Sequence, residues 1–167
     1  MIRFENVVKR FDGREVLSGV SFEIAKGEVL AVVGPSGTGK SVLLKHLVRL
    51  LTPTSGRVWL DDVEISAATG DALEAIRARF GYLFQGGALL GWLTVAENVA
   101  LPLRERTRLA SAEIDARVAE ALAAVELTEA ADRYPAEISG GMQKRAGLAR
   151  AIVRRSDIVL YDEPTSG

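Results

Sequence analysis

The spacing of hydrophobic and polar residues divides the chain into a strand-rich first half and a mostly helical second half. In the first half, apolar runs separated by glycine, proline and aspartate predict strands at residues 2–8, 17–24, 29–33, 57–60 and 81–84. Asp12-Gly13 predicts a tight turn between the first two strands. The run 29–33 is apolar at every position, which is typical of a strand buried on both faces of a parallel sheet.

Apolar residues at helical spacing predict helices at residues 39–51 and 71–80, and two longer helices in the second half. We expect Ser111 to cap the first of these longer helices and Ser139 to begin the second. Their apolar faces are expected to consist of Ile114, Val118, Ala121, Leu122 and Val125 in one, and Met142, Ala146, Ala149, Ile152 and Val153 in the other. A last apolar run at residues 158–161 predicts a buried strand.

The length and composition are typical of one globular domain. The chain has 167 residues, of which 48% are hydrophobic and 26% charged, with a formal net charge of −1. This balance gives no general attraction to DNA, so we expect no nucleic-acid partner. The lack of cysteine excludes disulfides and thiolate metal sites, and a single histidine excludes a histidine-rich metal centre. With neither a signal peptide nor a run of about 20 apolar residues, a cytoplasmic protein is expected.

Residues 34–41 fit the phosphate-binding pattern G-x-x-x-x-G-K-[ST], directly after a predicted buried strand and at the start of a predicted helix. The motif consists of Gly34, Pro35, Ser36, Gly37, Thr38, Gly39, Lys40 and Ser41. Glycines let backbone amides approach a ligand, and the helix N-terminus adds roughly half a positive charge. Lys40 would bind the β- and γ-phosphates, and Ser41 would ligate Mg²⁺. The alternative is a chance glycine-rich turn, but composition alone predicts only about 0.005 matches.

Asp162 and Glu163 follow the apolar run 158–161, so two carboxylates end a predicted buried strand. Ligands of open parallel sheets bind at the carboxyl ends of the strands. We expect Asp162 to hold Mg²⁺ through water, because Mg²⁺ keeps most of its hydration shell and uses few carboxylates. Glu163 is expected to orient or deprotonate the water that attacks the γ-phosphate. The alternative is a pair of solvated acids at a strand end.

Residues 138–142 read I-S-G-G-M and resemble the LSGGQ signature of the nucleotide-binding domain of ABC transporters, with Met142 in the glutamine position. The resemblance implies that Ser139 and the amides of Gly140 and Gly141 contact the γ-phosphate of ATP bound to a second copy. Physical chemistry agrees, since a serine cap at a helix N-terminus leaves amides to offer to an anion.

Other positions match the same family. Gln85 corresponds to its Q-loop glutamine, which implies contact with Mg²⁺ and the attacking water and sensing of the membrane partner. Phe11 falls where the family places an aromatic ring under adenine; packing in the core is the alternative. Residues 164–167 correspond to the segment that leads into the D-loop. His46 is not the family's switch histidine and is expected to be a helix residue without a catalytic role.

By this resemblance the fold class is α/β: a P-loop NTPase with a RecA-like core of mainly parallel sheet, an N-terminal antiparallel β-subdomain and an inserted α-helical subdomain. We expect a single domain over residues 1–167. Within it, 1–85 and 156–167 would form the β-subdomain and core, and 86–155 the helical subdomain with the signature turn. The family's domain continues past Gly167, which implies a chain incomplete at the C-terminus, without the D-loop aspartate and the switch histidine. Hydrolysis by this polypeptide alone is therefore expected to be weak.

The resemblance implies an ATP-binding and ATP-hydrolysing subunit of an ABC transporter, with ATP and Mg²⁺ as cofactors. Lys40, Gln85 and Glu163 would act in hydrolysis. The expected partners are a second copy, arranged head to tail, and an integral membrane permease. The permease would hold the protein at the cytoplasmic face of the membrane.

Residues 84–90, 93–105 and 138–145 resemble one ABC subfamily, the ATPases of MCE-type phospholipid transport systems that include the Mla machinery. This implies a lipid as cargo and an MCE-type lipid-binding protein as a further partner. The apolar segment 88–93 around Trp92 would line the groove for a permease helix, or would pack inside the helical subdomain. Alternatives are an ABC ATPase for another substrate, a nucleotide-binding fragment without turnover, and a soluble ABC ATPase of DNA repair or translation.

Overall fold

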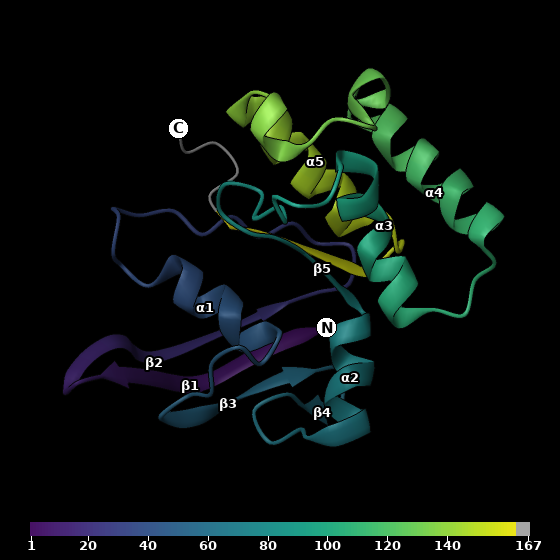
Figure 1. Ribbon diagram of the computed structural model, residues 1–167. Coiled ribbons are helices and arrows are strands. Elements are labelled where there is room, and N and C mark those ends of the chain that lie inside the picture. The colour runs from purple at the N-terminus through teal and green to yellow at the C-terminus, as the bar shows by residue number, and fades with distance from the viewer. Residues whose placement is uncertain (163–167) are drawn as a thin grey trace. The chain divides into compact units, whose positions relative to one another are not determined.

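The computed structural model describes residues 1–162, and the contacts within the chain divide it into two units, Met1–Arg77 and Ala78–Gly167. An antiparallel sheet forms most of the first unit. The second unit consists of helices and a two-stranded parallel sheet (Figure 1).

The sheet of the first unit has the strand order β2-β1-β3-β4. Its strands are β1 (Ile2–Phe11), β2 (Arg14–Ile24), β3 (Ser55–Leu60) and β4 (Val63–Glu64). β1 and β2 form a hairpin in which Phe11 pairs with Arg14, and the turn residues Asp12 and Gly13 have positive φ angles of 46° and 81°. Positive φ at both positions is what a type I′ turn requires. The predicted turn is therefore confirmed, and the strands predicted at residues 2–8, 17–24 and 57–60 are observed.

The core of the first unit is built from one face of this sheet and from two helices, α1 (Lys40–Leu47) and α2 (Gly70–Ala78). Its buried apolar side chains include Phe4 and Val7 of β1, Val58 and Leu60 of β3, Leu43 and Leu47 of α1 and Ile76 of α2. Burial of side chains of this size stabilises the unit by roughly 1.5–3 kcal/mol each. Helix α1, which follows the glycine-rich loop, is thus anchored by its apolar side.

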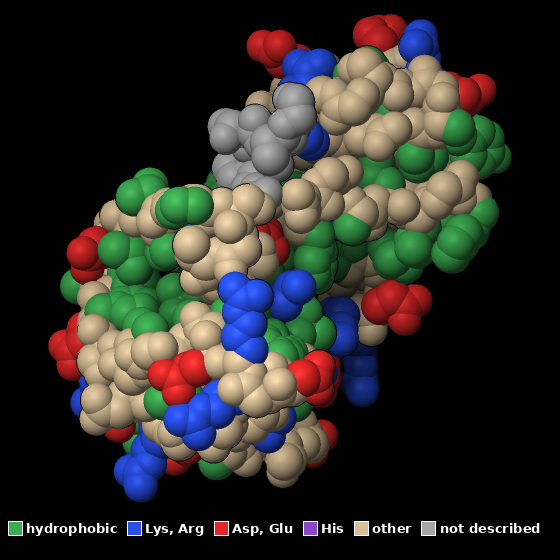
Figure 2. Space-filling view, turned by 90° about the vertical axis from the view of Figure 1, so that its left-hand side faces the viewer, with side chains coloured by type: hydrophobic (Ala, Val, Ile, Leu, Met, Phe, Trp, Pro, Cys, Tyr) green, Lys and Arg blue, Asp and Glu red, His purple; other side chains and the backbone are tan. Residues whose placement is uncertain are grey.

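The predicted buried strand at residues 29–33 is not observed, and this prediction was wrong for the described residues. The segment belongs to neither sheet, and the exposed fraction is 94% at Val29 and 89% at Val33. Figure 2 shows hydrophobic side chains gathered at the surface of one face. An apolar run marks where burial would be favourable, but a strand also needs a neighbouring strand to pair its backbone groups. Among residues 1–162 no strand pairs with this segment.

In the second unit, two short strands pair in parallel. These are β5 (Phe80–Leu83) and β6 (Ile158–Tyr161), with Phe80 opposite Ile158 and Leu83 opposite Tyr161. Both strands were predicted, β5 with bounds shifted by one residue. Helix α5 (Gly140–Ile152) packs on β5, where a Cβ added to Gly81 would lie only 2.1 Å from the carbonyl oxygen of Ala151.

Three helices of the second unit, α3 (Val95–Arg106), α4 (Ser111–Ala124) and α5, pack against one another around a shared apolar core. Two 3₁₀ turns, η1 (Thr128–Ala130) and η2 (Pro135–Glu137), lie between α4 and α5. The predicted apolar face of α4 is buried throughout. That of α5 is buried at Ala146, Ala149 and Val153, while Met142 and Ile152 are half-buried.

The two predicted helix caps have different outcomes. Ser139 caps α5, because its hydroxyl oxygen accepts a hydrogen bond from the amide of Met142 at 3.3 Å. Ser111 does not cap α4: it is the first helical residue, and Ala110 takes the cap position. The helix starts earlier because the amides of Glu113 and Ile114 already donate to the carbonyl of Ala110.

Asn98, on α3, is a fully buried polar side chain that ties the preceding loop to this helix. Its amide nitrogen donates to the carbonyls of Leu90, Leu93 and Thr94 at 3.0–3.1 Å. Its oxygen accepts a hydrogen bond from the amide of Leu90 at 2.8 Å. One side chain thus hydrogen-bonds to four backbone groups of residues 90–94; the carbonyls of Leu90 and Thr94 also accept from the backbone amides of Leu93 and Asn98.

We predict that Asn98→Ala lowers the free energy of unfolding by about 3 kcal/mol, because buried backbone groups lose their hydrogen bonds. Urea denaturation followed by circular dichroism measures this value. Asp115→Ala, on the exposed side of α4, is the control and should change stability by no more than about 0.5 kcal/mol. An equal change in the free energy of unfolding for the two substitutions would contradict the stabilising role of the Asn98 hydrogen bonds.

Candidate nucleotide-binding site

The glycine-rich loop, residues 34–39, connects the exposed apolar segment to helix α1. Gly39 is the residue before the helix, with φ of 93°. A Cβ added there would lie 3.0 Å from Cγ1 and 3.1 Å from the carbonyl oxygen of Val16 on β2. Both the left-handed backbone and this close approach require glycine. The start of α1 is therefore seated directly on the sheet, with the rest of the loop exposed.

Lys40, the first residue of α1, folds its side chain back over the loop. Its ammonium group donates hydrogen bonds to the carbonyl oxygens of Gly34 at 3.0 Å and Pro35 at 2.8 Å. The hydroxyl of Thr38 donates to the same Pro35 oxygen at 2.9 Å. A positive charge is thus held above a turn that ends at a helix N-terminus, an arrangement suited to binding phosphate. Ser41 follows in the first turn of the helix, half-buried.

In the second unit, the parallel pairing of β5 and β6 brings Gln85 and Asp162 to the same end of the two strands. The last pair is Leu83 with Tyr161, and the amide of Asp162 donates to the carbonyl of Leu83 at 3.0 Å. Gln85 lies two residues beyond Leu83, in an exposed turn closed by a hydrogen bond from the amide of Gly87 to the carbonyl of Phe84. The two predicted site residues therefore lie on neighbouring chain segments.

Asp162 is a buried carboxylate, with an exposed fraction of 5%. The hydroxyl of Tyr82 donates a hydrogen bond to its Oδ2 at 3.2 Å. Burial, together with the negative charge of Asp162, raises the pKa of Tyr82 well above its ordinary value. Tyr82 therefore keeps its proton and remains a donor at physiological pH.

The signature turn lies at the N-terminus of α5. Ser139, Gly140 and Gly141 are exposed. The side-chain amide of Gln143 donates to the carbonyl of Pro135 at 2.8 Å and so ties the start of α5 to the segment before the turn. The amide of Gln143 donates to the carbonyl of Ser139 at 2.9 Å. Small exposed residues at a helix N-terminus leave room for an anionic group to approach the amides.

The same helix holds the segment that follows Gln85. The guanidinium of Arg150 donates to the carbonyls of Gly87 at 2.6 Å and Ala88 at 2.9 Å. A Cβ added to Gly147 would lie 2.7 Å from the Cα of Gly87, so helix and loop are in direct backbone contact. The signature helix and the loop of Gln85 therefore form one packed assembly inside the second unit.

The remaining predicted positions have separate surroundings. Phe11 is 40% exposed at the end of β1, beneath the ammonium of Lys9 at 5.0 Å from the ring centroid, and is not part of the core. His46 is buried on α1, where its Nδ1 lies 2.6 Å from the carbonyl of Val42 and burial lowers its pKa. Glu163 and residues 164–167 lie outside the described part of the chain.

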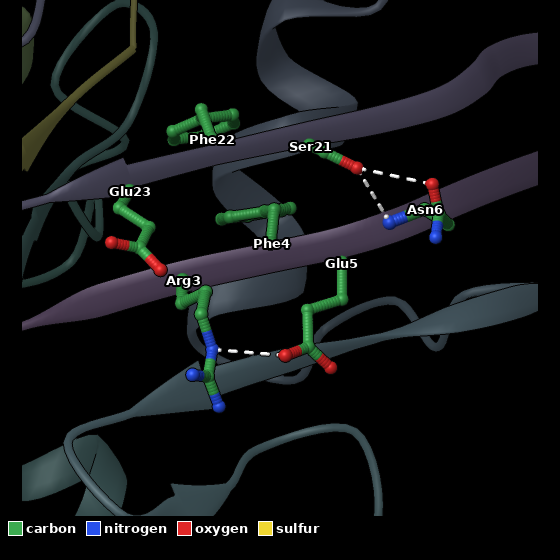
Figure 3. A pocket seen from close by; sticks show the side chains of 7 residues that line it. All are labelled: Arg3, Phe4, Glu5, Asn6, Ser21, Phe22 and Glu23. Carbon is green, nitrogen blue, oxygen red and sulfur yellow. Dashed lines mark hydrogen bonds and ion pairs between the residues drawn. The ribbon is translucent and has the colours of Figure 1, made fainter.

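A shallow pocket on β1 and β2 is a separate feature of the first unit (Figure 3). Its polar side chains engage one another: Arg3 forms an ion pair with Glu5 at 3.0 Å. The hydroxyl of Ser21 donates to the side-chain oxygen of Asn6 at 3.2 Å and accepts from the backbone amide of Asn6 at 2.8 Å. These pairings make it part of the sheet's own structure.

Two residues that hydrogen-bond to Asp162 or to the loop after Gln85, Tyr82 and Arg150, were missed by the sequence analysis. Arg150 could have been found, since it shares the apolar face of α5 with Ala146 and Val153, and a charged residue there needs buried partners. Tyr82 could not have been found, because its contact with Asp162 depends on the register of two strands distant in sequence.

The predicted metal ligands of the second unit have the chemistry that a magnesium ion prefers. Mg²⁺ prefers oxygen ligands and binds proteins through one or two carboxylates together with substrate phosphates. In the second unit, Gln85 and Asp162 both offer oxygen, and Asp162 is a buried carboxylate that accepts a hydrogen bond from Tyr82. In the first unit, Ser41 offers a hydroxyl oxygen. Within residues 1–162, no helix is both long and apolar enough to span a membrane.

Comparison with known proteins places the chain in a family. The sequence profile described as "ABC transporter" matches residues 17–166. The chain is 45% identical over 166 residues to the "Probable ribonucleotide transport ATP-binding protein mkl" of Mycobacterium leprae, covering 99% of this chain and 48% of that protein. It is 46% identical to the "Methionine import ATP-binding protein MetN" of Xanthomonas euvesicatoria pv. vesicatoria, covering 99% of this chain and 50% of that one. It thus spans about half the length of these curated relatives.

Solved structures agree. The dimeric structure of MJ0796, a bacterial ABC transporter cassette, matches with a TM-score of 0.92 at 36% identity, over 99% of this chain and 75% of that one. A dimeric post-hydrolysis state of the same ATP-binding cassette, bound to ADP and Pi, matches with a TM-score of 0.91 at 35% identity and the same coverage. From the residues matched and the shared fold, we conclude that the chain belongs to the ABC transporter family and has the P-loop α/β fold of its ATP-binding cassette.

Proposed function

We propose that this chain binds ATP and, within the complete protein, hydrolyses it to drive an ABC transporter. The observation that carries the proposal is the loop of residues 34–39, where the Lys40 ammonium is held above a glycine turn at a helix N-terminus. A full positive charge over a loop that leads into a helix N-terminus suits a triphosphate better than any neutral ligand.

Each candidate residue has a role in this proposal. Lys40 binds the β- and γ-phosphates, the loop amides of residues 34–41 surround them, and Phe11 stacks against the adenine. Ser41, Gln85 and Asp162 hold Mg²⁺, which when bound neutralises charge that develops on the phosphates. Glu163 accepts a proton from the attacking water, and Gln85 helps to orient that water.

We further propose that the site is completed by a second copy, arranged head to tail. The turn of Ser139, Gly140, Gly141 and Met142, of which the first three residues are exposed, would contact in one copy the γ-phosphate bound by the other. Support comes from the capped, open N-terminus of α5 and from the dimeric solved cassettes that share this fold. Binding of ATP would then close the pair and hydrolysis would reopen it. A permease in the membrane would receive this motion at its cytoplasmic face.

The cargo that we propose is a lipid, specifically a phospholipid delivered with an MCE-type lipid-binding protein. The proposal rests on the resemblance of residues 84–90, 93–105 and 138–145 to ATPases of such systems. The two relatives compared above are named for ribonucleotide and for methionine at 45% and 46% identity, so overall identity at this level does not select a cargo.

We predict that Lys40→Ala weakens ATP binding by about 100-fold, because a charge-assisted hydrogen-bond donor to the phosphates is lost. Isothermal titration of the full-length protein with ATP measures this change. Lys45→Ala removes the same charge five residues later on α1 and should alter the affinity by no more than about two-fold. Unchanged affinity in Lys40→Ala would contradict the proposed phosphate contact.

We predict that the full-length protein, purified with its permease, transfers phospholipid between vesicles in an ATP-dependent manner. Fluorescent phospholipid transfer measures this, with Lys40→Ala as the inactive control. The same complex should show no acceleration of ATP hydrolysis by methionine or ribonucleotides. Acceleration by either of these, without lipid transfer, would reject the lipid cargo and leave the ATPase assignment in place.

A further inference from the structure

Asp162 is tied to β5 at two points. Its backbone amide donates to the carbonyl of Leu83 at 3.0 Å, and its side-chain Oδ2 accepts from the hydroxyl of Tyr82 at 3.2 Å. The first contact fixes where the residue lies, and the second limits how its carboxylate can rotate.

Tyr82 is itself held in place. It lies on β5 opposite Leu160, and its ring stacks on that of Phe84, with centroids 4.1 Å apart and planes 23° from parallel. The side chain is half-buried. Because its ring is stacked and lies on a strand, the Tyr82 hydroxyl has a nearly fixed position. Little side-chain conformational entropy is therefore lost when it donates to the Asp162 carboxylate.

The orientation of the Asp162 carboxylate affects how tightly it can bind the Mg²⁺ of the proposed function. Mg²⁺ demands near-ideal octahedral geometry and tolerates misplaced ligands poorly. Groups that hydrogen-bond to metal-binding carboxylates typically contribute 10–100-fold to metal affinity.

We propose that Tyr82 is a positioning residue for the Mg²⁺ carboxylate of Asp162, acting through its hydroxyl on Oδ2. The proposal rests on the metal role given to Asp162 in the proposed function. Because Tyr82 and Gln85 share one strand and the turn that follows it, the strand sets the position of both the carboxylate and the glutamine. A shift of β5 would displace the two together.

The test measures how much Mg²⁺ strengthens nucleotide binding, without any turnover. A hydrolysis-resistant ATP analogue is titrated into the full-length protein by calorimetry, once with Mg²⁺ and once with EDTA. The ratio of the two dissociation constants, EDTA over Mg²⁺, is the metal ratio. We expect Tyr82→Phe to reduce the metal ratio about ten-fold while the constant in EDTA stays within about two-fold of the wild type.

Two matched variants make the result specific. Tyr161→Phe deletes a hydroxyl from the neighbouring residue, which is 47% exposed, and should leave the metal ratio unchanged. Asp162→Asn should reduce the ratio at least as much as Tyr82→Phe. Thermal melting checks that Tyr82→Phe, which keeps the ring and its stacking, remains folded, and all titrations are run well below the melting temperature of every variant.

Each outcome decides a different claim. An unchanged metal ratio in Tyr82→Phe, with a reduced ratio in Asp162→Asn, would overturn the role of Tyr82 and leave the proposed function standing. Weaker binding in EDTA by the same factor as in Mg²⁺ would make Tyr82 a general structural residue, which also overturns the proposal. An unchanged ratio in Asp162→Asn would remove the metal role of Asp162 from the proposed function and this inference with it.

Discussion

The parallel pairing of β5 with β6 is the constraint on which the second unit's part of the site depends. Because Leu83 lies opposite Tyr161, the residues that follow each strand emerge together at one end. Gln85 and Asp162 are 77 positions apart in sequence yet come from adjacent segments there. A slip of one residue in this register would turn the side chains of one strand to its other face and separate them from their partners.

Helix α5 extends this constraint to the signature turn. It packs on β5 so closely that Gly81 has no room for a side chain. Through Arg150 and Gly147 it also holds the loop after Gln85. The turn at Ser139, the glutamine loop and the buried carboxylate therefore belong to one packed body. The proposed coupling of ATP binding to a permease would use this continuous packing.

Features of the fold and of the candidate site could be predicted from the sequence where they depend on residues close together in the chain. The glycine-rich loop, the Asp12-Gly13 turn and the cap at Ser139 are encoded within a few residues, and their backbone geometry in the structure is as predicted. Residues 29–33 were wrongly predicted as a buried strand, because an apolar run does not reveal whether a partner strand is present. The hydrogen bond of Tyr82 to Asp162 depends on register, which no single sequence specifies.

The central claim is that one triphosphate is bound by the lysine-bearing loop of one copy and by the serine-capped helix of another. The most direct measurement is a crystal structure of the full-length protein with Mg²⁺ and a hydrolysis-resistant ATP analogue. The account predicts phosphate oxygens within hydrogen-bonding distance of Lys40 Nζ in one copy and of the Ser139 hydroxyl in the other. A nucleotide bound with its phosphates away from both groups would contradict it.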